Sequence, residues 1–346
     1  MSQVEPVGII GAGSFGTAMA NLLALNTDVL VYSRNLELVK TLRKDRFRFG
    51  VKLHDRVKVV NNFAEVAERC QLIFPIVPSD NFRDMMRSIT DHLTPAHLLI
   101  HGTKGFDLTG VKIEDIPKLG LDRRAVATMT DVIKEESVVV RVGALTGPNL
   151  ARELLDGQPS ASVIASKFDE VIHRAHAVLS SQQLHVFHTH DMLGAELAGV
   201  LKNVIALGSG ILKGYGLGKN VQAMLITRGL HEMIHFGQAL GSESKAFFGT
   251  AGIGDLIATA TSKKSRNYMF GYRLGNGESL EEVRATSQEL AEGVRTLMIT
   301  RHLARNLRLR APITEMLYRI VFEKYPIDNA MNFLITYPYE VDVDFL

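Results

Sequence analysis

The sequence predicts a two-domain protein: an N-terminal α/β domain built on a mostly parallel, doubly wound sheet, and an all-α C-terminal domain. Up to about residue 190, apolar β-rich runs alternate with helical patterns, which is typical of a parallel sheet covered by helices on both faces. After Asp191 the β-rich runs stop and long helical segments follow. At 346 residues the chain is also long enough for two hydrophobic cores. We therefore expect domains at residues 1–190 and 191–346.

Eight runs in the first domain are predicted to be buried strands. They are apolar and β-branched, and most lack the alternation with polar residues that a half-exposed strand would show. These runs cover residues 7–11, 28–33, 57–60, 72–77, 97–102, 137–145, 160–166 and 185–190. The segments between several of them have helical patterns, at residues 14–25, 35–45, 62–70, 81–89, 149–157 and 169–181.

The second domain is predicted from five helical segments. Asp191 precedes the first of them and is a residue type that often caps a helix N-terminus. The five segments cover residues 192–212, 220–240, 279–291, 295–307 and 312–325.

Composition excludes several classes of protein. The net charge of +2 gives no sign of nucleic-acid binding. Cys70 is the single cysteine, so no internal disulfide is possible, and a cytoplasmic location is expected. Residues 7–27 carry no charge, as a membrane span would, but their glycines crowd together. A strand, a tight turn and a helix explain that pattern better, so no membrane insertion is expected.

A glycine-rich turn predicts dinucleotide binding. Gly11, Gly13 and Gly16 form G-x-G-x-x-G, with Ser14 and Phe15 between the last two glycines. The turn follows an apolar strand and opens a helix, which is the Rossmann-type context that makes this short motif informative. Its glycines allow a tight turn, close approach of the backbone to a pyrophosphate, and close packing of helix on strand. The helix N-terminus would then face the phosphates.

The end of the second predicted strand bears on the choice of cofactor. A site that prefers NAD usually has a carboxylate there to bind the ribose 2′-hydroxyl. This chain offers Arg34 instead, and a guanidinium can pair with the 2′-phosphate of NADP. The cofactor is therefore expected to be NADP or NAD, with NADP favoured. A solvated surface arginine is the alternative interpretation.

A second motif points to a different function. His231, Glu232 and His235 match H-E-x-x-H, the pattern of zinc proteases. Gln238 and Gly241 follow, where the longer protease motif needs glycine and a third histidine. Three alternating histidines on a predicted strand likewise lack the cysteine or carboxylate that would complete a metal site. We interpret the motif as a coincidence and expect no metal.

Several short motifs occur in one order along the chain. They are GAGSFGTA, HGTKG, TGPNLA, LKNVIALGSG, AGIGDL, SRN, EGV and PIT. The series, from about residue 7 to about residue 325, resembles the NAD(P)-dependent glycerol-3-phosphate dehydrogenases of the bacterial biosynthetic type. The resemblance implies interconversion of dihydroxyacetone phosphate and sn-glycerol 3-phosphate, supplying phospholipid synthesis. It also implies a helical domain like that of 6-phosphogluconate dehydrogenase, and a cytoplasmic homodimer.

The resemblance also implies roles for individual residues. The catalytic residues would be Lys202, Asp255 and Lys104. Cofactor contacts would come from Ser14, Phe15, Arg34, Lys104, Ala151, Arg266, Leu290 and Glu292, in addition to the three glycines of the turn. Substrate contacts would come from Lys104, Gly147, Asn149, Lys202, Asp255, Ser265, Arg266 and Asn267. The chain departs from the family at Asn149, where threonine or serine is usual, so the substrate contact of Asn149 is in doubt.

The residues themselves are consistent with this chemistry. Reduction of a ketone needs a proton donor at the oxygen. Lys202 suits that role if burial and cationic neighbours lower its pKa towards neutrality. Three of its four helical neighbours are small, which would leave room for a ligand or form a packing seam. Asp255 would cap a helix or hold the lysine. Arg266 would bind a phosphate or lie solvated on the surface.

Two alternative functions remain at this point. One is a dehydrogenase of the 6-phosphogluconate type that acts on a different phosphorylated or hydroxy-acid substrate. The other is a non-catalytic NADP-binding sensor, which would keep the glycine turn and lack the catalytic lysine. The presence of Lys202, Asp255 and Arg266 favours an enzyme.

Overall fold

The computed structural model describes residues 5–287, 291–338 and 341–342. Its contacts divide the chain into two compact units. The first comprises Met1–Asp107 and Ala127–Glu196, and the second comprises Leu108–Val126 and Leu197–Leu346. This division differs from the expected boundary at residues 190/191 in two ways. Leu108–Val126 groups with the later helices, and the last boundary between the units, at Glu196/Leu197, falls inside a helix.

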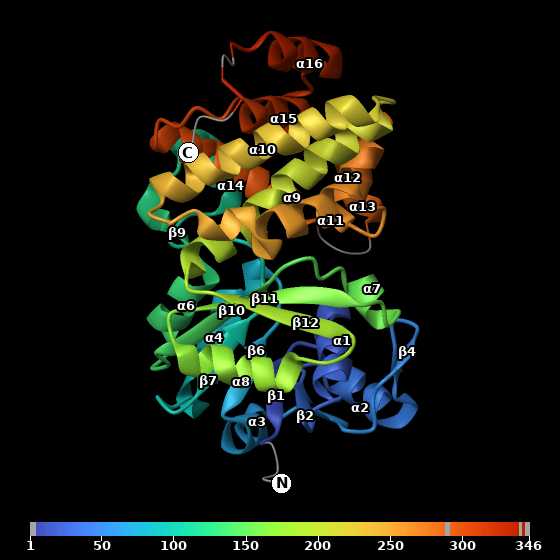
Figure 1. The fold of residues 1–346 in the computed structure, drawn as a ribbon, viewed down its shortest axis with the longest axis vertical. Coiled ribbons are helices and arrows are strands. Elements are labelled where there is room, and N and C mark those ends of the chain that lie inside the picture. Colours follow the sequence, from blue (N-terminus) through green and yellow to red (C-terminus); the bar gives the residue numbers. More distant parts are fainter. Residues whose placement is uncertain (1–4, 288–290, 339–340, 343–346) are drawn as a thin grey trace. The chain divides into compact units, whose positions relative to one another are not determined.

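The first unit contains an eight-stranded sheet with the order β12-β11-β10-β7-β6-β1-β2-β5 (Figure 1). All neighbouring strands are parallel except β10 and β11. The predicted fold class is therefore confirmed, and each of the eight predicted runs supplies one strand. The strands are β1 (Val7–Ile10), β2 (Val29–Tyr32), β5 (Val57–Val60), β6 (Leu72–Pro75), β7 (Leu98–His101), β10 (Arg141–Thr146), β11 (Ser160–Ser166) and β12 (Leu184–Thr189).

Helices cover both faces of this sheet, as a doubly wound fold requires. Helix α1 packs with α7 and α8 over one face, and α4 packs with α6 on the other. The main core lies between the sheet and the layer of α1 and α8, where residues such as Ile9, Met19 and Ile164 are fully buried. These helices are α1 (Ser14–Leu23), α2 (Leu36–Asp45), α3 (Phe63–Arg69), α4 (Phe82–Ile89), α6 (Met129–Glu136), α7 (Ala151–Leu155) and α8 (Asp169–Leu179).

The second unit is helical, and each of the five predicted segments supplies one of its helices, with residues 288–290 of one segment outside the described part of the chain. Four further helices, α5, α11, α12 and α16, lie outside these five segments. The unit includes α5 (Ile116–Leu119), α9 (Met192–Gly214, whose first turn belongs to the first unit), α10 (Lys219–Ala239), α11 (Asp255–Thr261), α12 (Arg266–Gly275), α13 (Leu280–Thr286), α14 (Glu292–Asn306), α15 (Pro312–Glu323) and α16 (Ile327–Thr336). Helix α5 packs against α14, which explains why the segment around it groups with this unit.

Short elements complete the described chain. Two small sheets pair β3 (Phe47–Arg48) with β4 (Val51–Lys52), and β8 (Asp107–Leu108) with β9 (Val126–Ala127). The 3₁₀ turns are η1 (Ser79–Asn81), η2 (Thr90–His92), η3 (Ile113–Asp115), η4 (Arg123–Ala125) and η5 (Lys245–Phe248), and η6 (Thr250–Gly254) is a π-helical turn.

Helix α9 is the one helix in the described chain that is long and apolar enough to cross a membrane. Its apolar window is entirely buried inside the protein, as expected for the core helix of a helical unit. The uncharged segment at residues 7–27 forms β1 and α1, which confirms the predicted strand, turn and helix.

Glycines let α9 and α12 pack backbone against backbone. A β-carbon on Gly210 or on Gly214 would lie 2.0 Å from a carbonyl oxygen of α12. A β-carbon on Gly271 would lie 2.0 Å from the carbonyl oxygen of Leu207, and one on Gly275 would meet the oxygen of Ile211 at 2.1 Å. We call these four glycines the glycine seam. They allow α12 to pack directly against α9, the helix that carries Lys202.

Candidate active site

The glycine turn in the first unit has the geometry of a dinucleotide site. Gly11 has a φ of +111°, and a β-carbon there would lie 2.2 Å from the carbonyl oxygen of Ile76. A β-carbon on Gly16 would lie 2.1 Å from the carbonyl oxygen of Gly11. Gly13 differs, because nothing in the described chain lies within 4 Å of its missing β-carbon. The first and third glycines therefore serve packing, and the second leaves room for a ligand.

The start of α1 suits a phosphate. Its N-cap is Gly13, no side chain caps it, and no acidic residue stands in its first turn. The amides and the positive dipole end of the helix are therefore not neutralised by the described side chains of that turn. A pyrophosphate would fit here. The turn therefore has the features needed to bind the dinucleotide cofactor that the motif predicted.

Arg48 is a cation beside this turn that the sequence reasoning missed. It lies on the β3–β4 hairpin, and its Nε donates to the carbonyl oxygen of Ala12 at 2.7 Å. Its guanidinium also stacks over the ring of Phe49, 4.5 Å from the centroid. Partial burial lowers the pKa of Arg48. Arg34 lies between β2 and α2 with an exposed side chain, which is the position that the sequence predicted for it.

Lys104 lies at the carboxyl edge of the sheet. It follows β7, and its Nζ donates to the carbonyl oxygen of Gly147 at 3.0 Å, just beyond the neighbouring strand β10. Gly147 has a φ of +103°, a conformation that favours glycine. The ring of Phe15 covers Gly102, whose β-carbon would lie 2.9 Å from it. The structure thus brings Lys104 and Gly147 together, as the motifs implied.

The side chain of Asn149 is hydrogen-bonded to the end of β10 and to strand β11. Its Nδ2 donates to the carbonyl oxygen of Thr146 at 2.9 Å, and its Oδ1 accepts from the hydroxyl of Ser162 at 2.8 Å. These bonds define the loop between β10 and α7, where Ala151 is the first helical residue. Asn149 therefore shapes the loop, and its contact with substrate stays a prediction.

A buried pair anchors the start of α9 within the first unit. The carboxylate of Glu196 lies 3.0 Å from Nε2 of His101 and accepts from the backbone N–H of Thr130 at 3.0 Å. His101 is the last residue of β7, three residues before Lys104. Sequence reasoning missed Glu196 because its partners lie far away along the chain.

The second unit holds a compact polar cluster around Lys202, which is 5% exposed. Its Nζ donates to Oδ1 of Asp255 at 2.5 Å and to the hydroxyl of Thr259 at 2.6 Å. Asp255 is 1% exposed and also accepts from Thr259, at 3.2 Å. The predicted contact between Asp255 and the lysine is therefore present. The nearest charged partner of Lys202 is a carboxylate and not the cationic neighbour that the sequence argument considered.

A π-helical turn delivers Asp255 to this cluster. The turn η6 leads directly into α11, so Asp255 stands at the helix N-terminus, with Gly254 as its N-cap. Gly252 permits the turn, because a β-carbon there would lie 2.1 Å from the carbonyl oxygen of Phe247. Such turns occur frequently at functional sites. Of the two interpretations left open, the contact with Lys202 is therefore present, and the capping role is wrong, because Gly254 is the N-cap and no described side chain caps α11.

The SRN motif forms the first turn of α12. Ser265 caps the helix by accepting from the N–H of Tyr268 at 3.2 Å. Arg266 is exposed at the helix start, and Asn267 is buried and donates to Oδ1 of Asn203 at 2.9 Å. The structure therefore joins the motif to the residue that follows Lys202. Glu292 is the first residue of α14, and Leu290 lies outside the described residues.

Within the HEMIH pentapeptide, residues 231–235, Glu232 stabilises the start of another helix. Glu232 caps the N-terminus of α15, accepting from the N–H groups of Ile313 at 2.5 Å and Thr314 at 3.0 Å, and from the Thr314 hydroxyl at 2.8 Å. Its carboxylate is thereby engaged with a helix end. Among the residues with a described position, no three His, Cys, Asp or Glu side chains gather as a metal site would need.

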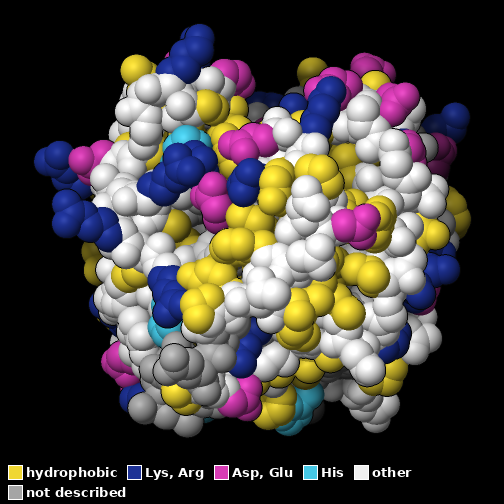
Figure 2. Space-filling model, turned by 90° about the horizontal axis from the view of Figure 1, so that it is seen from above, with side chains coloured by type: hydrophobic (Ala, Val, Ile, Leu, Met, Phe, Trp, Pro, Cys, Tyr) yellow, Lys and Arg dark blue, Asp and Glu magenta, His cyan; other side chains and the backbone are white. Residues whose placement is uncertain are grey.

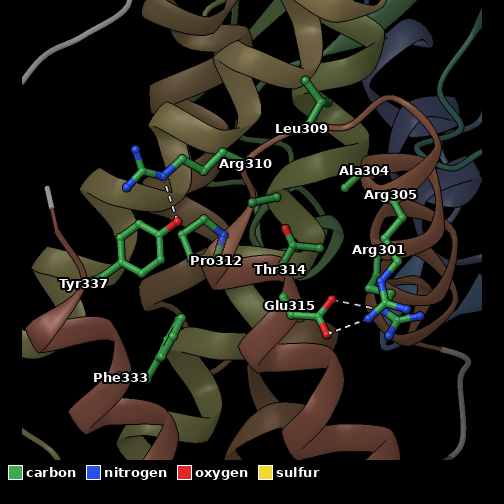
Figure 3. Close-up of a pocket in the computed structure, with 11 residues that line it drawn as sticks. Arg301, Ala304, Arg305, Leu309, Arg310, Pro312, Thr314, Glu315, Phe333 and Tyr337 are labelled. Atoms are coloured by element: carbon green, nitrogen blue, oxygen red, sulfur yellow. Dashed lines mark hydrogen bonds and ion pairs between the residues drawn. The ribbon is translucent and has the colours of Figure 1, made fainter.

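A pocket of about 260 Å³ lies elsewhere in the helical unit, along α14, α15 and α16 (Figure 3). The charged side chains that line it form ion pairs and hydrogen bonds with other lining residues. Glu315 accepts from Arg301 and Arg305, both at 3.1 Å, and Arg310 donates to the hydroxyl of Tyr337 at 2.7 Å. None of the residues predicted for catalysis lines it, and we assign its ion pairs to the packing of these helices.

Together, these features define a class. A dinucleotide turn on a doubly wound sheet, followed by a helical unit with a buried lysine–carboxylate pair, is the arrangement of an NAD(P)-dependent dehydrogenase. The comparisons with known proteins narrow the class. Residues 6–172 match the family described as NAD-dependent glycerol-3-phosphate dehydrogenase N-terminus, and residues 191–332 match its C-terminus. The chain belongs to the NAD(P)-dependent glycerol-3-phosphate dehydrogenase family.

Individual relatives agree over the full length. The chain is 36% identical to the glycerol-3-phosphate dehydrogenase [NAD(P)+] of Ectopseudomonas mendocina, covering 100% of this chain and 98% of the relative. It is 37% identical to that of Azotobacter vinelandii, covering 99% and 97%. The crystal structure of glycerol-3-phosphate dehydrogenase from Coxiella burnetii superposes with a TM-score of 0.85 at 28% identity, covering 96% of this chain and 99% of that one.

Proposed function

We propose that this chain interconverts dihydroxyacetone phosphate and sn-glycerol 3-phosphate with NAD(P)(H). The observation that carries the proposal is the buried cluster of Lys202, Asp255 and Thr259, in a chain whose glycine turn suits a dinucleotide. The nicotinamide supplies or removes the hydride when bound. The protein's own residues must bind the two ligands and move one proton.

Lys202 is the proton donor in this proposal. In reduction its Nζ gives a proton to the developing alkoxide of the ketone, and in oxidation it takes the proton back. Asp255 and Thr259 each accept a hydrogen from the ammonium, and these two bonds hold the Nζ of Lys202 in place for the proton transfer. Arg266, exposed at the start of α12, would bind the phosphate bidentately.

The first unit supplies the remaining contacts of the proposal. The amides at the start of α1 would bind the pyrophosphate, and Arg34 would favour NADP by pairing with its 2′-phosphate. Arg48 adds positive charge beside the turn through its bond to Ala12. Lys104 would hold cofactor and substrate together from its place against Gly147.

The test is the oxidation of NADPH and of NADH with dihydroxyacetone phosphate, in wild type and in Lys202→Met. The variant keeps the bulk of the stem and removes the proton, so kcat should fall by about 10²–10⁴-fold. The affinity for NADPH should stay unchanged. Lys213→Met is the matched control, because Lys213 lies on the same helix and is exposed. Near-normal kcat in folded Lys202→Met would refute the role of Lys202.

Arg266→Met separates binding from proton transfer. If the guanidinium anchors the phosphate, KM for dihydroxyacetone phosphate should rise strongly. A wild-type chain that binds NADPH and turns over no dihydroxyacetone phosphate would favour the non-catalytic sensor instead. Turnover of a different hydroxy acid or phosphorylated ketone would favour the other dehydrogenase.

We further propose a cytoplasmic homodimer that supplies glycerol 3-phosphate for phospholipid synthesis. Figure 2 shows hydrophobic side chains grouped across the middle of one face of the helical unit, and exposed apolar patches often mark interaction surfaces. On α16, Phe333 is 40% exposed and Ile335 is 61% exposed. Light scattering after size exclusion would report the mass, and a monomer at micromolar concentration would contradict the dimer.

A further inference from the structure

The carboxamide of Asn267 links two helices inside the second unit. Its Nδ2 donates to Oδ1 of Asn203 at 2.9 Å, and its Oδ1 accepts from the backbone N–H of Gly293 at 2.8 Å. Asn203 and Asn267 are 4% and 9% exposed, and Gly293 is buried. Asn203 follows Lys202 on α9, and Gly293 follows Glu292 in the first turn of α14. One buried side chain therefore bridges the lysine helix and the start of α14.

Gly293 makes the approach of α14 possible. A β-carbon at this position would lie 2.8 Å from the carbonyl oxygen of Asn203 and 2.9 Å from Oδ1 of Asn267. Both distances are shorter than side chains tolerate, and one of the two contacts is rigid backbone. The start of α14 is therefore held directly against the residue beside Lys202, with no space for any side chain between them.

We propose that Asn267 is a positioning residue that couples the substrate cluster to Glu292 at the start of α14. The inference rests on the proposed function, in which Arg266 binds the substrate phosphate beside Lys202, and on the cofactor contact that the family resemblance implies for Glu292. Substrate bound to Arg266 fixes the first turn of α12. Because Asn267 lies in that turn and accepts a hydrogen bond from Gly293, the start of α14 is fixed as well. By linkage, substrate then tightens cofactor binding, and cofactor tightens substrate binding by the same factor.

This role differs from the substrate contact that the family resemblance implies for Asn267. Its carboxamide has one donor and one acceptor engaged with protein groups, which leaves one hydrogen and one lone pair. A residue that only touched substrate would alter KM for the substrate when replaced. A positioning residue would alter the ratio between cofactor affinities measured with and without substrate.

The experiment measures that ratio in the full chain. NADPH is titrated by its fluorescence, alone and with saturating sn-glycerol 3-phosphate, a pair that cannot react because both partners are reduced. In wild type we expect sn-glycerol 3-phosphate to lower the Kd for NADPH by about 5-fold or more. In Gly293→Ala the ratio should approach one, because the added methyl group separates α14 from Asn267.

Two more variants keep the test decisive. Asn267→Leu removes both bonds and should also lose the ratio, while Asn267→Asp keeps an acceptor for the N–H of Gly293 and should retain most of it. Gly218→Ala is the matched control, since nothing in the described chain lies within 4 Å of that position. Melting temperatures identify variants that do not fold, and the wild-type ratio then carries the test, because a ratio of one would overturn the coupling.

Failure of this inference and failure of the proposed function can be told apart. If wild type turns over dihydroxyacetone phosphate and Gly293→Ala and Asn267→Leu both keep the wild-type Kd ratio, Asn267 is not a positioning residue. A wild-type ratio of one also overturns the coupling. If wild type does not turn over dihydroxyacetone phosphate, the proposed function itself is wrong.

Discussion

Glu232 gives the sharpest prediction about stability, because a buried carboxylate caps α15. Burial raises the pKa of Glu232 from an ordinary 4.5 to about 7, against the three hydrogen bonds from Ile313 and Thr314, which lower it. The proton is therefore bound more tightly in the folded chain than in the unfolded chain. The stabilisation from this group is fully present below about pH 4.5 and is lost as the pH rises through about 7.

The size of the effect follows from the shift. Each pKa unit corresponds to about 1.4 kcal/mol, so a shift from 4.5 to about 7 amounts to about 3 kcal/mol in the free energy of unfolding. Glu232→Gln is neutral at every pH and removes this dependence. The amide can no longer accept from every donor at the helix end, which costs about 1–3 kcal/mol independently of pH.

Urea unfolding of wild type and Glu232→Gln at pH 5 and pH 8 tests this reasoning. Wild type should be the more stable protein at pH 5, and its advantage should shrink or reverse by pH 8, with a change of about 3 kcal/mol between the two conditions. Glu281→Gln makes the same chemical change on an exposed residue of α13 and serves as control. Parallel stability profiles for wild type and Glu232→Gln would refute the argument.

Three further predictions concern the cofactor, the metal motif and the glycine seam. Arg34→Asp should weaken NADPH use more than NADH use by about 1–3 kcal/mol in kcat/KM, and equal losses would show that Arg34 does not read the 2′-position. His231→Ala combined with His235→Ala should keep activity within a few-fold, and zinc analysis should find no stoichiometric metal in the wild-type protein. Gly210→Ala should lower the free energy of unfolding by at least about 1–3 kcal/mol, since its methyl group would lie 2.0 Å from a backbone oxygen; Gly218→Ala should not.

The sequence predicted the elements that have a strong periodic pattern. All eight strands of the sheet and the long helices of the second unit follow from apolar runs and helical periodicity. Helix α12 lies outside the five predicted helical segments because glycines interrupt it, and glycine is a poor helix former. Those glycines stabilise the helix in its tertiary context, since they allow it to contact the backbone of α9. Local propensity is overridden there by packing, which sequence reasoning cannot see.

Long-range contacts account for the rest of what was missed. Leu108–Val126 groups with the second unit through α5, which packs on α14 almost two hundred residues later. Arg48 has no local pattern that marks it as a functional residue, and only its bond to Ala12 places it beside the dinucleotide turn. Asn267 was found by its motif, but the engagement of its carboxamide with Asn203 and Gly293 depends on three helices.

The small residues around Lys202 illustrate how one sequence feature can serve two purposes. From the sequence, two interpretations of these residues were open: they leave space for a ligand, or they let another helix pack closely. The seam exists, but it lies further along α9, at Gly210 and Gly214, where α12 contacts the backbone. Because α12 begins with the SRN motif, the seam brings Arg266 and Asn267 to the helix that carries Lys202. Close helix packing is therefore a condition for assembling the proposed substrate cluster, so a lost glycine should reduce activity as well as stability.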